Sequence, residues 1–330
     1  FCQAEDGIRD VERSRGLGDV YKRQIILGAT GSGKTTTASK IVSEINKLEN
    51  YINVVIIDWH GEYKHLVKDI KYINPYKDIS LNPINEINKS SLIEILDIFE
   101  DVFNLTSPQS YLLYESLKKM LNNKNHSLFD LEEIIKNYDE SSYWIREVKY
   151  ALLRKITMLN RVDSAKLFNN NGVSLKDLLL EFIKPIVIDV SLIPSIALRK
   201  IYSLLLLKSI FNIHVASRRM KTIVVIEEAH NIFPRNSSNE FLVKYIAESR
   251  KFGIGVIAVT QSPSSILEDL MKNTATKIIH SIRSSIDIDI ICRITKIPLE
   301  YEKLLPVLEP GEAIFYTIGY KYPLIIKILR

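Results

Sequence analysis

Cysteine and long apolar stretches are what this sequence of 330 residues has least of. Its only cysteines are Cys2 and Cys292, which excludes a disulfide framework and favours a reducing location. No apolar run reaches the roughly 20 residues that a membrane helix needs, and the sequence opens with no signal-peptide pattern. We therefore expect a cytoplasmic protein without a membrane partner.

Charge and histidine content give little guidance to function. The formal net charge of +5 permits nucleic-acid binding without indicating it. Among the six histidines, His60 and His65 do not share a helical face and the others stand alone, so no histidine metal site is predicted. Hydrophobic residues at 46% and charged residues at 25% are typical of a globular protein, and the length allows one large or two ordinary domains.

Residues 1–24 differ in composition from the rest of the sequence. They contain four arginines and one lysine, whereas residues 25–330 contain 11 arginines and 28 lysines. Neither helical nor strand periodicity is present, and the stretches 4–10 and 14–24 resemble a translated sequencing-library adapter. We expect this segment to be non-native, and the native protein to continue upstream of Ile25 with a part that is missing here. A natural disordered arm is the alternative.

Residues Gly28–Thr35 (GATGSGKT) match the phosphate-binding pattern G-x-x-x-x-G-K-[ST]. The apolar run Ile25–Leu27 precedes the pattern and the helix-like run Thr36–Leu48 follows it, as the pattern requires. We expect backbone N–H groups to bind phosphate, Lys34 to reach the β- and γ-phosphates, and Thr35 to ligate Mg²⁺. The predicted nucleotide-binding residues are Gly28, Thr30, Gly31, Ser32, Gly33, Lys34, Thr35 and Thr36.

Two acidic residues follow the apolar run Thr222–Ile226, as a nucleotide-hydrolysing site requires. Glu227 is predicted to hold Mg²⁺ through its water shell, and Glu228 to orient and polarise the attacking water. Gln261 follows the predicted strand Gly255–Thr260 and is predicted to hydrogen-bond the γ-phosphate or that water. Together these residues form a candidate hydrolytic site.

Further polar residues stand near the ends of predicted strands. Asp58 and Glu62 follow the buried run Tyr51–Asp58, and ligand-contacting residues of parallel sheets lie past the carboxyl ends of strands. An ordinary turn is the alternative for these two acids. His230 is expected either to contact phosphate or simply to pack or cap. The basic cluster Ser217–Lys221 suits the negative end of a helix, so it only weakly indicates nucleic acid.

The apolar pattern changes in the middle of the sequence. Residues 88–182 carry apolar residues at helical spacing and no convincing strand. We therefore expect an α/β fold with a doubly wound, mainly parallel sheet, whose P-loop core comes in two parts, 25–87 and 183–330, around an all-helical insertion. The runs 308–317 and 322–328 are expected to pair as a hairpin.

In combination and order, these motifs resemble the HerA branch of the HerA–FtsK P-loop motor ATPases. The resemblance covers nearly all of residues 25–330. It implies a RecA-like fold, ATP and Mg²⁺ as cofactors, a homo-hexameric ring, translocation of double-stranded DNA, and a NurA-like nuclease partner in DNA end processing. HerA proteins carry a β-barrel domain before the nucleotide loop, where this sequence is adapter-like. The matching stretches are Gly28–Thr35, Asp58–Tyr63, Ile226–Asn231, Glu248–Gly253, Val259–Pro263, Gly311–Ala313 and Pro323–Lys327.

The same resemblance assigns roles to individual residues. Arg250 matches an arginine finger that reaches the neighbouring subunit's site, with a surface salt bridge to Glu248 as the alternative. Arg283 is a weaker candidate for a similar role, and the loop Pro234–Asn239 is our candidate pore loop. The positions that match the family's residues for phosphate, Mg²⁺, catalysis and sensing are Lys34, Thr35, Glu227, Glu228 and Gln261.

Two other functions stay open at the level of sequence. One is a membrane-associated motor of the conjugation or secretion type. The other is a nucleotide-gated scaffold for an effector, which the complete set of catalytic residues disfavours. A small signalling GTPase is also disfavoured because the sequence has no N-K-x-D guanine-reading motif.

Overall fold

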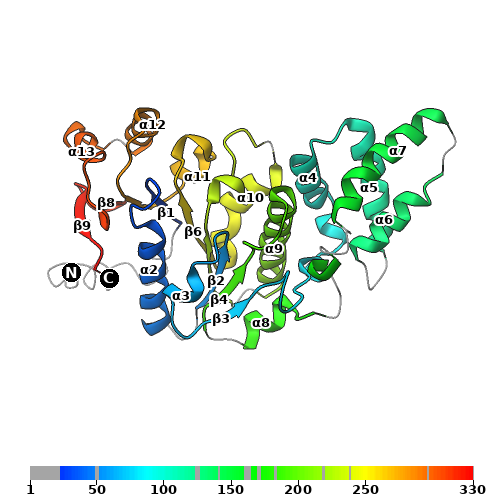
Figure 1. The fold of residues 1–330 in the computed structure, drawn as a ribbon, viewed down its shortest axis with the longest axis horizontal. Coiled ribbons are helices and arrows are strands. Elements are labelled where there is room, and N and C mark those ends of the chain that lie inside the picture. Colours follow the sequence, from blue (N-terminus) through cyan, green and yellow to red (C-terminus); the bar gives the residue numbers. More distant parts are fainter. Residues whose placement is uncertain are drawn as a thin grey trace.

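The computed structural model describes residues 23–48, 52–122, 127–139, 142–159, 165–168, 172–181, 184–217, 220–237, 239–295 and 297–329. Its strands form one sheet in the order β3-β4-β2-β5-β6-β1-β7-β8-β9 (Figure 1). Strands β1 to β7 run parallel, and β8 and β9 extend the sheet as the predicted antiparallel hairpin. The bounds are β1 (Gln24–Leu27), β2 (Asn53–Asp58), β3 (Lys71–Ile73), β4 (Ile186–Asp189), β5 (Thr222–Ile226), β6 (Ile254–Thr260), β7 (Thr276–Ile279), β8 (Glu312–Thr317) and β9 (Leu324–Lys327).

Alternation along the strands sends side chains into two separate hydrophobic cores. In β5, Val224 and Ile226 belong to the larger core, whereas Ile223 and Val225 belong to the smaller one. A strand that is covered on both faces needs apolar residues along its whole length, which explains the unbroken apolar run of β5. The predicted α/β class with a doubly wound, mainly parallel sheet is confirmed.

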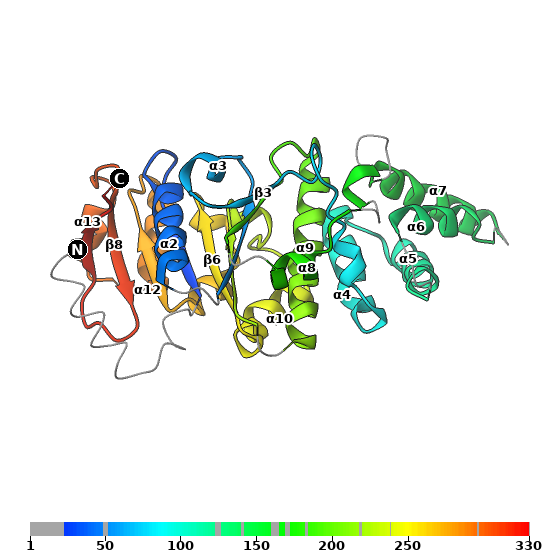
Figure 2. The same ribbon diagram turned by 90° about the horizontal axis from the view of Figure 1, so that it is seen from below.

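Helices cover both faces of this sheet (Figure 2). The smaller core lies under α2 (Lys34–Leu48) and α3 (Tyr63–Leu66). The larger core lies under α9 (Ile196–Ala216) and α10 (Glu240–Glu248). Three further helices complete the C-terminal half: α11 (Glu268–Lys272), α12 (Ser285–Thr295) and α13 (Leu299–Leu304).

Helices also fill the chain between β3 and β4. The described residues of 88–182 contain no strand, and in Figure 1 α4 to α7 lie on the side of the molecule opposite β8 and β9. Capping boxes begin two of these helices, formed by Thr106 and Gln109 at the start of α5 and by Ser127 and Asp130 at the start of α6. The helices are α4 (Leu92–Phe103), α5 (Ser107–Met120), α6 (Leu128–Lys136), α7 (Tyr143–Ile156) and α8 (Leu175–Glu181).

Helix α9 is buried around most of its circumference because the sheet covers one side and α4 packs against another. It joins the helical segment to the sheet core in one continuous apolar cluster. None of the helices formed by the described residues is both long enough and apolar enough to cross a bilayer.

Some sequence-based expectations fall partly outside the described residues. Of the adapter-like segment, residues 1–22 are not described, and Gln24 is the first residue of β1. Arg218 and Arg219 of the basic cluster and Ser238 of the candidate pore loop also lie outside.

Candidate nucleotide site

The candidate site lies at the carboxyl edge of the sheet. Strands β2, β5, β6 and β1 are consecutive neighbours, so the loops that follow them meet at this edge. An open cavity of about 560 Å³ lies between these loops and the end of the C-terminal hairpin. Its lining residues are Thr30, Gly31, Gly33, Lys34, Thr35, Thr36, His60, Glu62, Glu227, Glu228, Gln261, Pro310, Gly311 and Ile328.

The phosphate-binding loop owes its shape to glycine. Gly31 and Gly33 have φ of +78° and +107°, which glycine adopts without strain. The loop ends where α2 begins, so the positive end of a 15-residue helix faces the cavity. Ser32 Oγ is buried without a hydrogen-bond partner among the described residues. An unpaired hydroxyl and free amide groups at a helix start suit an anionic ligand such as phosphate.

Lys34 is the buried cation of this loop. Its ammonium donates a hydrogen bond to the carbonyl of Ala29 at 2.9 Å. Burial lowers the pKa of Lys34, and the nearby carboxylates of Glu228, Glu227 and Glu62 oppose this effect. Lys34 therefore lies among acidic side chains. A bound phosphate would be a further ionic partner for its ammonium group or would take the place of one of these acids.

Glu227 is a buried acid directly after β5. It is 3% exposed and accepts a hydrogen bond from Tyr63 Oη at 2.7 Å. Burial raises the pKa of Glu227 to about 7; the Tyr63 hydrogen bond opposes this, and Asp58 and Glu228 add to it. A divalent cation near this carboxyl would favour its ionised form, so the residue fits the predicted role toward Mg²⁺.

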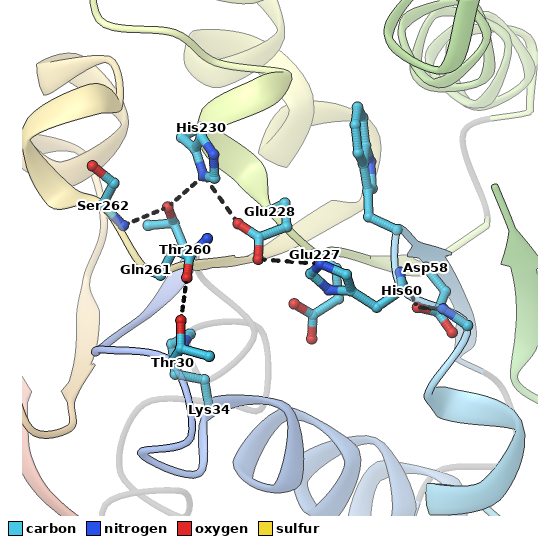
Figure 3. A network of polar contacts seen from close by, with 12 residues as sticks. Thr30, Lys34, Asp58, His60, Glu227, Glu228, His230, Thr260, Gln261 and Ser262 are labelled. Atoms are coloured by element: carbon cyan, nitrogen blue, oxygen red, sulfur yellow. Dashed lines mark hydrogen bonds and ion pairs between the residues drawn. The ribbon is translucent and has the colours of Figure 1, made fainter. Parts of the chain in front are cut away.

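Glu228 lies between two imidazole rings (Figure 3). One carboxylate oxygen is 3.2 Å from His230 Nδ1, and the other is 3.7 Å from His60 Nε2. Glu228 has φ of +47° and ψ of +46°, which is strained for a residue with a side chain. The strained backbone presents this carboxylate to the cavity directly beside Glu227.

His230 packs beside Glu228 and is not among the residues that line the cavity. Its Nδ1 is also 3.0 Å from Thr260 Oγ1, which accepts a hydrogen bond from the backbone of Ser262. Burial lowers the pKa of His230, and Glu228 opposes that effect. Of the two alternatives for His230, the geometry favours packing over contact with phosphate.

Gln261 reaches the phosphate-binding loop from the end of β6. Its side-chain oxygen accepts a hydrogen bond from Thr30 Oγ1 at 2.5 Å (Figure 3). Both residues line the cavity. Gln261, the residue predicted to sense the γ-phosphate, therefore contacts the phosphate-binding loop directly.

Arg250 lies away from this cavity. It is exposed on a 3-10 turn, Ser249–Phe252, that precedes β6. Burial lowers the pKa of Arg23, just before β1, and the charge of Arg250 adds to this effect. Both positions are at the amino edge of the sheet, opposite the nucleotide loop. Arg283 is exposed past the end of β7 and is not among the lining residues. Arg250 therefore cannot serve its own chain's site in this arrangement.

The candidate pore loop also follows β5 but leaves the cavity. Pro234 bridges to Ile266, and the backbone of Arg235 donates to Ser265 at 2.9 Å. The Arg235 guanidinium lies 3.6 Å from Glu268. This segment is therefore tied to the start of α11, and its pore role stays a prediction.

Several contacts of the site have no signal in the sequence. The C-terminal hairpin closes one wall, where Gly311 N donates to Ser32 O at 3.0 Å and Ile328 N to Gly311 O at 2.8 Å. A Cβ at Gly33 would lie 3.2 Å from the nitrogen of Gly311, so the two segments are in close contact. His280 is buried behind the loop. Only long-range packing reveals these contacts, because the hairpin is some 280 residues from the loop in sequence.

Asp58 shapes the loop after β2 and does not line the cavity. Its carboxylate accepts backbone hydrogen bonds from His60, Gly61 and Tyr63 at 2.9 to 3.1 Å. Burial raises the pKa of Asp58, and these hydrogen bonds oppose the shift. Of the two acids predicted here, Asp58 organises a turn, whereas Glu62 lines the cavity.

Comparison with known proteins identifies the family. The family model described as "Helicase HerA, central domain" matches residues 19–210, more than half of the chain, and a model described as "Zonular occludens toxin (Zot)" matches residues 196–300. The DNA double-strand break repair helicase HerA of Sulfurisphaera tokodaii is 27% identical, over 97% of this chain and 67% of that protein. The probable HerA helicase of Methanocaldococcus jannaschii is 26% identical, over 94% and 72%. The chain thus spans about two thirds of the length of such relatives.

Solved structures agree on the fold. VirB4 of Thermoanaerobacter pseudethanolicus aligns with a TM-score of 0.76 at 18% identity, covering 94% of this chain and 92% of that one. The plasmid coupling protein TrwB in complex with ADP and Mg²⁺ aligns with a TM-score of 0.70 at 13% identity, covering 94% and 86%. These likenesses confirm the RecA-like P-loop fold. The chain belongs to the HerA helicase central-domain family and is a P-loop ATPase.

Proposed function

We propose that this protein is an ATP-driven motor that translocates double-stranded DNA. The observation that carries the proposal is a single cavity that brings together Lys34, Thr35, Glu227, Glu228 and Gln261. Membership of the HerA helicase family and relatives named as DNA double-strand break repair helicases support DNA as the substrate.

ATP with Mg²⁺ fits the donors of this cavity. Lys34 binds the β- and γ-phosphates, and the Thr35 hydroxyl and Glu227 hold the cation together with water. Bound Mg²⁺ neutralises charge on the β- and γ-phosphates. The described residues contain no cluster of three or more histidine, cysteine or acidic side chains placed for a metal. The remaining nucleotide-binding residues are Gly28, Thr30, Gly31, Ser32, Gly33 and Thr36.

Glu228 and Gln261 carry the hydrolytic step. Glu228 orients the attacking water and accepts its proton as the water attacks the γ-phosphorus. Gln261 hydrogen-bonds the γ-phosphate or the water. In the structure the side chain of Gln261 instead accepts a hydrogen bond from Thr30, and binding of the γ-phosphate would replace this hydrogen bond.

Assembly completes the proposed site. We infer a homo-hexameric ring in which the exposed Arg250 enters the site of the neighbouring subunit, where an arginine finger contributes about 10³–10⁵ in rate in other systems. We also infer a NurA-like nuclease partner and DNA end processing in the cytoplasm, which the family resemblance supports. DNA held by its phosphates in a ring pore should bind without sequence preference and with strong salt dependence.

A membrane-associated conjugation or secretion motor is the second candidate. Its support is the fold likeness to VirB4 and TrwB, which at under 20% identity concerns the fold alone. A nucleotide-gated scaffold is a third. Stimulation of ATP turnover by DNA separates the proposed function from a scaffold and from a motor that moves protein, whereas a conjugation motor would share the stimulation.

The test measures ATP turnover by the purified protein with and without long linear duplex DNA at low salt. We expect DNA to raise turnover, and added salt to remove the stimulation. Glu228→Gln should lower turnover by about 10²–10⁴-fold while ATP still binds, because only the general base is lost. Glu300→Gln, an exposed acid on α13, is the matched control and should behave as the unaltered protein. Turnover indifferent to DNA would contradict the proposal.

A further inference from the structure

We propose that the loop Asp58–Tyr63 after β2 is a positioning element for ATP hydrolysis, in which His60 orients Glu228 and Tyr63 orients Glu227. The inference rests on the proposed roles of the two glutamates and does not depend on DNA. It assigns functions to two residues that neither the P-loop pattern nor the pair of acids points to.

Tyr63 holds one oxygen of Glu227. The tyrosine is fully buried at the start of α3, and its hydroxyl donates to Glu227 Oε1 at 2.7 Å. A hydrogen bond to one carboxylate oxygen fixes the rotation of the group and leaves the second oxygen for the cation or its water. Tyr63 thereby determines which way the buried carboxylate faces.

His60 faces the catalytic candidate from the cavity side. Its side chain is about half exposed and lines the cavity, with Nε2 at 3.7 Å from Glu228 Oε1 (Figure 3). This distance exceeds a direct hydrogen bond and lies within the range of an ion pair when the ring is protonated. The other oxygen of Glu228 meets His230, which Thr260 contacts in turn. Glu228 thus lies between His230, which contacts β6, and His60 of the loop after β2, and its Oε2 is buried without a hydrogen-bond partner among the described residues.

The loop has the rigidity that positioning requires. Asp58 accepts three of its backbone N–H groups, and Val190 N donates to Asp58 O at 2.9 Å. Gly61 has φ of +76°, and a Cβ there would lie 3.1 Å from Ser191 Oγ. The loop after β2 therefore packs closely against the loop after β4.

Arg199 joins these two loops from α9. Its guanidinium donates to the carbonyls of Ser191, Ile193 and Trp59 at 2.6, 3.0 and 3.3 Å, and it stacks over the Trp59 ring at 5.3 Å. An ordinary surface turn needs no such support. Among the residues that Arg199 contacts, Trp59 directly precedes His60, so the network supports the backbone that carries the imidazole.

The first test replaces His60 and measures basal ATP turnover without DNA. His60→Ala should lower kcat about 10-fold or more, within the 10–100-fold range for losing an outer positioning contact, and leave KM for ATP within about twofold. Because the site is open, added imidazole should restore part of the lost kcat. His65→Ala, which removes an exposed histidine on α3, is the matched control and should leave both constants unchanged. An unchanged kcat in His60→Ala, or a loss that imidazole does not relieve, would overturn the role of His60.

The second test replaces Tyr63 and needs no turnover. ADP affinity is measured by calorimetry with and without Mg²⁺ in Tyr63→Phe, which keeps the buried ring. We expect the gain in affinity that Mg²⁺ gives to shrink about 10-fold or more, while the Mg²⁺-free affinity stays the same. Tyr202→Phe removes another fully buried hydroxyl, bonded to Leu81 O, and controls for loss of fold stability. An undiminished Mg²⁺ effect would overturn the role of Tyr63. Because neither test contains DNA, their outcome is independent of whether DNA stimulates the protein.

Discussion

His280 is a buried imidazole that ties the nucleotide-binding helix to the C-terminal hairpin. Its Nε2 lies 2.9 Å from Thr37 Oγ1 on α2, and its Nδ1 lies 2.9 Å from the carbonyl of Glu312 on β8. A carbonyl only accepts, so the neutral ring carries its proton on Nδ1. Burial lowers the pKa of His280 to about 4; the Glu312 contact opposes this and Lys34 adds to it.

This buried histidine predicts a pH-dependent stability. The unfolded chain binds the proton near pH 6.5 and the folded protein only near pH 4, so the contribution is complete above 6.5 and is lost as pH falls toward 4. The loss should reach up to about 3 kcal/mol in the free energy of unfolding. Chemical denaturation across this range should show wild type approaching His280→Gln in stability as pH falls. The exposed His65→Gln should stay parallel to wild type, and a pH-independent gap for His280→Gln would contradict the prediction.

Whether a residue of the candidate site could be predicted depends on how far away in the sequence its partners lie. Lys34, Thr35 and the two acids after β5 were predictable because each motif is local and stands at a strand end. The contacts of Tyr63 and His280 were not, although Tyr63 ends the matching stretch Asp58–Tyr63, because their partners lie 164 and 243 residues away. Only the sheet order brings such pairs together.

At the scale of elements, α4 presents three acids toward α9 and α10. Glu94 pairs with Lys244 at 2.8 Å and Asp101 with Lys200 at 2.8 Å. Between them, Asp97 Oδ2 is buried without a hydrogen-bond partner among the described residues. Burial raises the pKa of Asp97 to about 6, with nearby carboxylates adding to the effect. The contact between α4 and the core therefore contains one unfavourable charge.

Replacing that charge should stabilise the protein above neutral pH. The folded state holds the Asp97 proton more tightly than the unfolded chain, so the carboxylate destabilises the fold above about pH 6, and the penalty fades toward 3.8. Because the group is only partly buried, we expect Asp97→Asn to add about 1–2 kcal/mol near pH 8 and almost nothing near pH 4. Denaturant titrations at both pH values measure this, with the exposed Asp177→Asn on α8 as control. Equal stabilities of variant and wild type near pH 8 would count against it.

The bounds of the helices and strands are less predictable from the sequence than their presence. Buried parallel strands such as β2 and β5 are predictable from their unbroken apolar runs. The motif Glu248–Gly253 spans the end of α10 and a 3-10 turn, a boundary that the sequence does not indicate. Strand β3 was not predicted. It has only three residues, Lys71–Ile73, and Tyr72 at its centre is fixed by a hydrogen bond to Asp189 of β4. The segment has no apolar alternation of its own, and it is a strand because it pairs with β4.

At the scale of the whole molecule, the nucleotide loop and Arg250 occupy opposite edges of one sheet. The loop follows the carboxyl end of β1. Arg250 precedes β6, which runs parallel to β1, and lies close enough to Arg23 at the amino end of β1 for its charge to add to the lowering of the Arg23 pKa by burial. A ring built by head-to-tail contacts places one edge of each subunit against a different edge of the next. That arrangement is what a finger supplied in trans requires.

Mixing two inactive variants tests this arrangement. Arg250→Ala and Glu228→Gln should each lose turnover alone, since one lacks the finger and the other the general base. In a mixture, an Arg250→Ala subunit keeps its own Glu228 and can receive Arg250 from a Glu228→Gln neighbour, so turnover should return to roughly a quarter of wild type for random one-to-one assembly. Lys251→Ala, which alters the adjacent exposed cation paired with Glu248, should stay active alone. If Arg250→Ala is active by itself, or if the mixture stays as inactive as its components, Arg250 does not act between subunits.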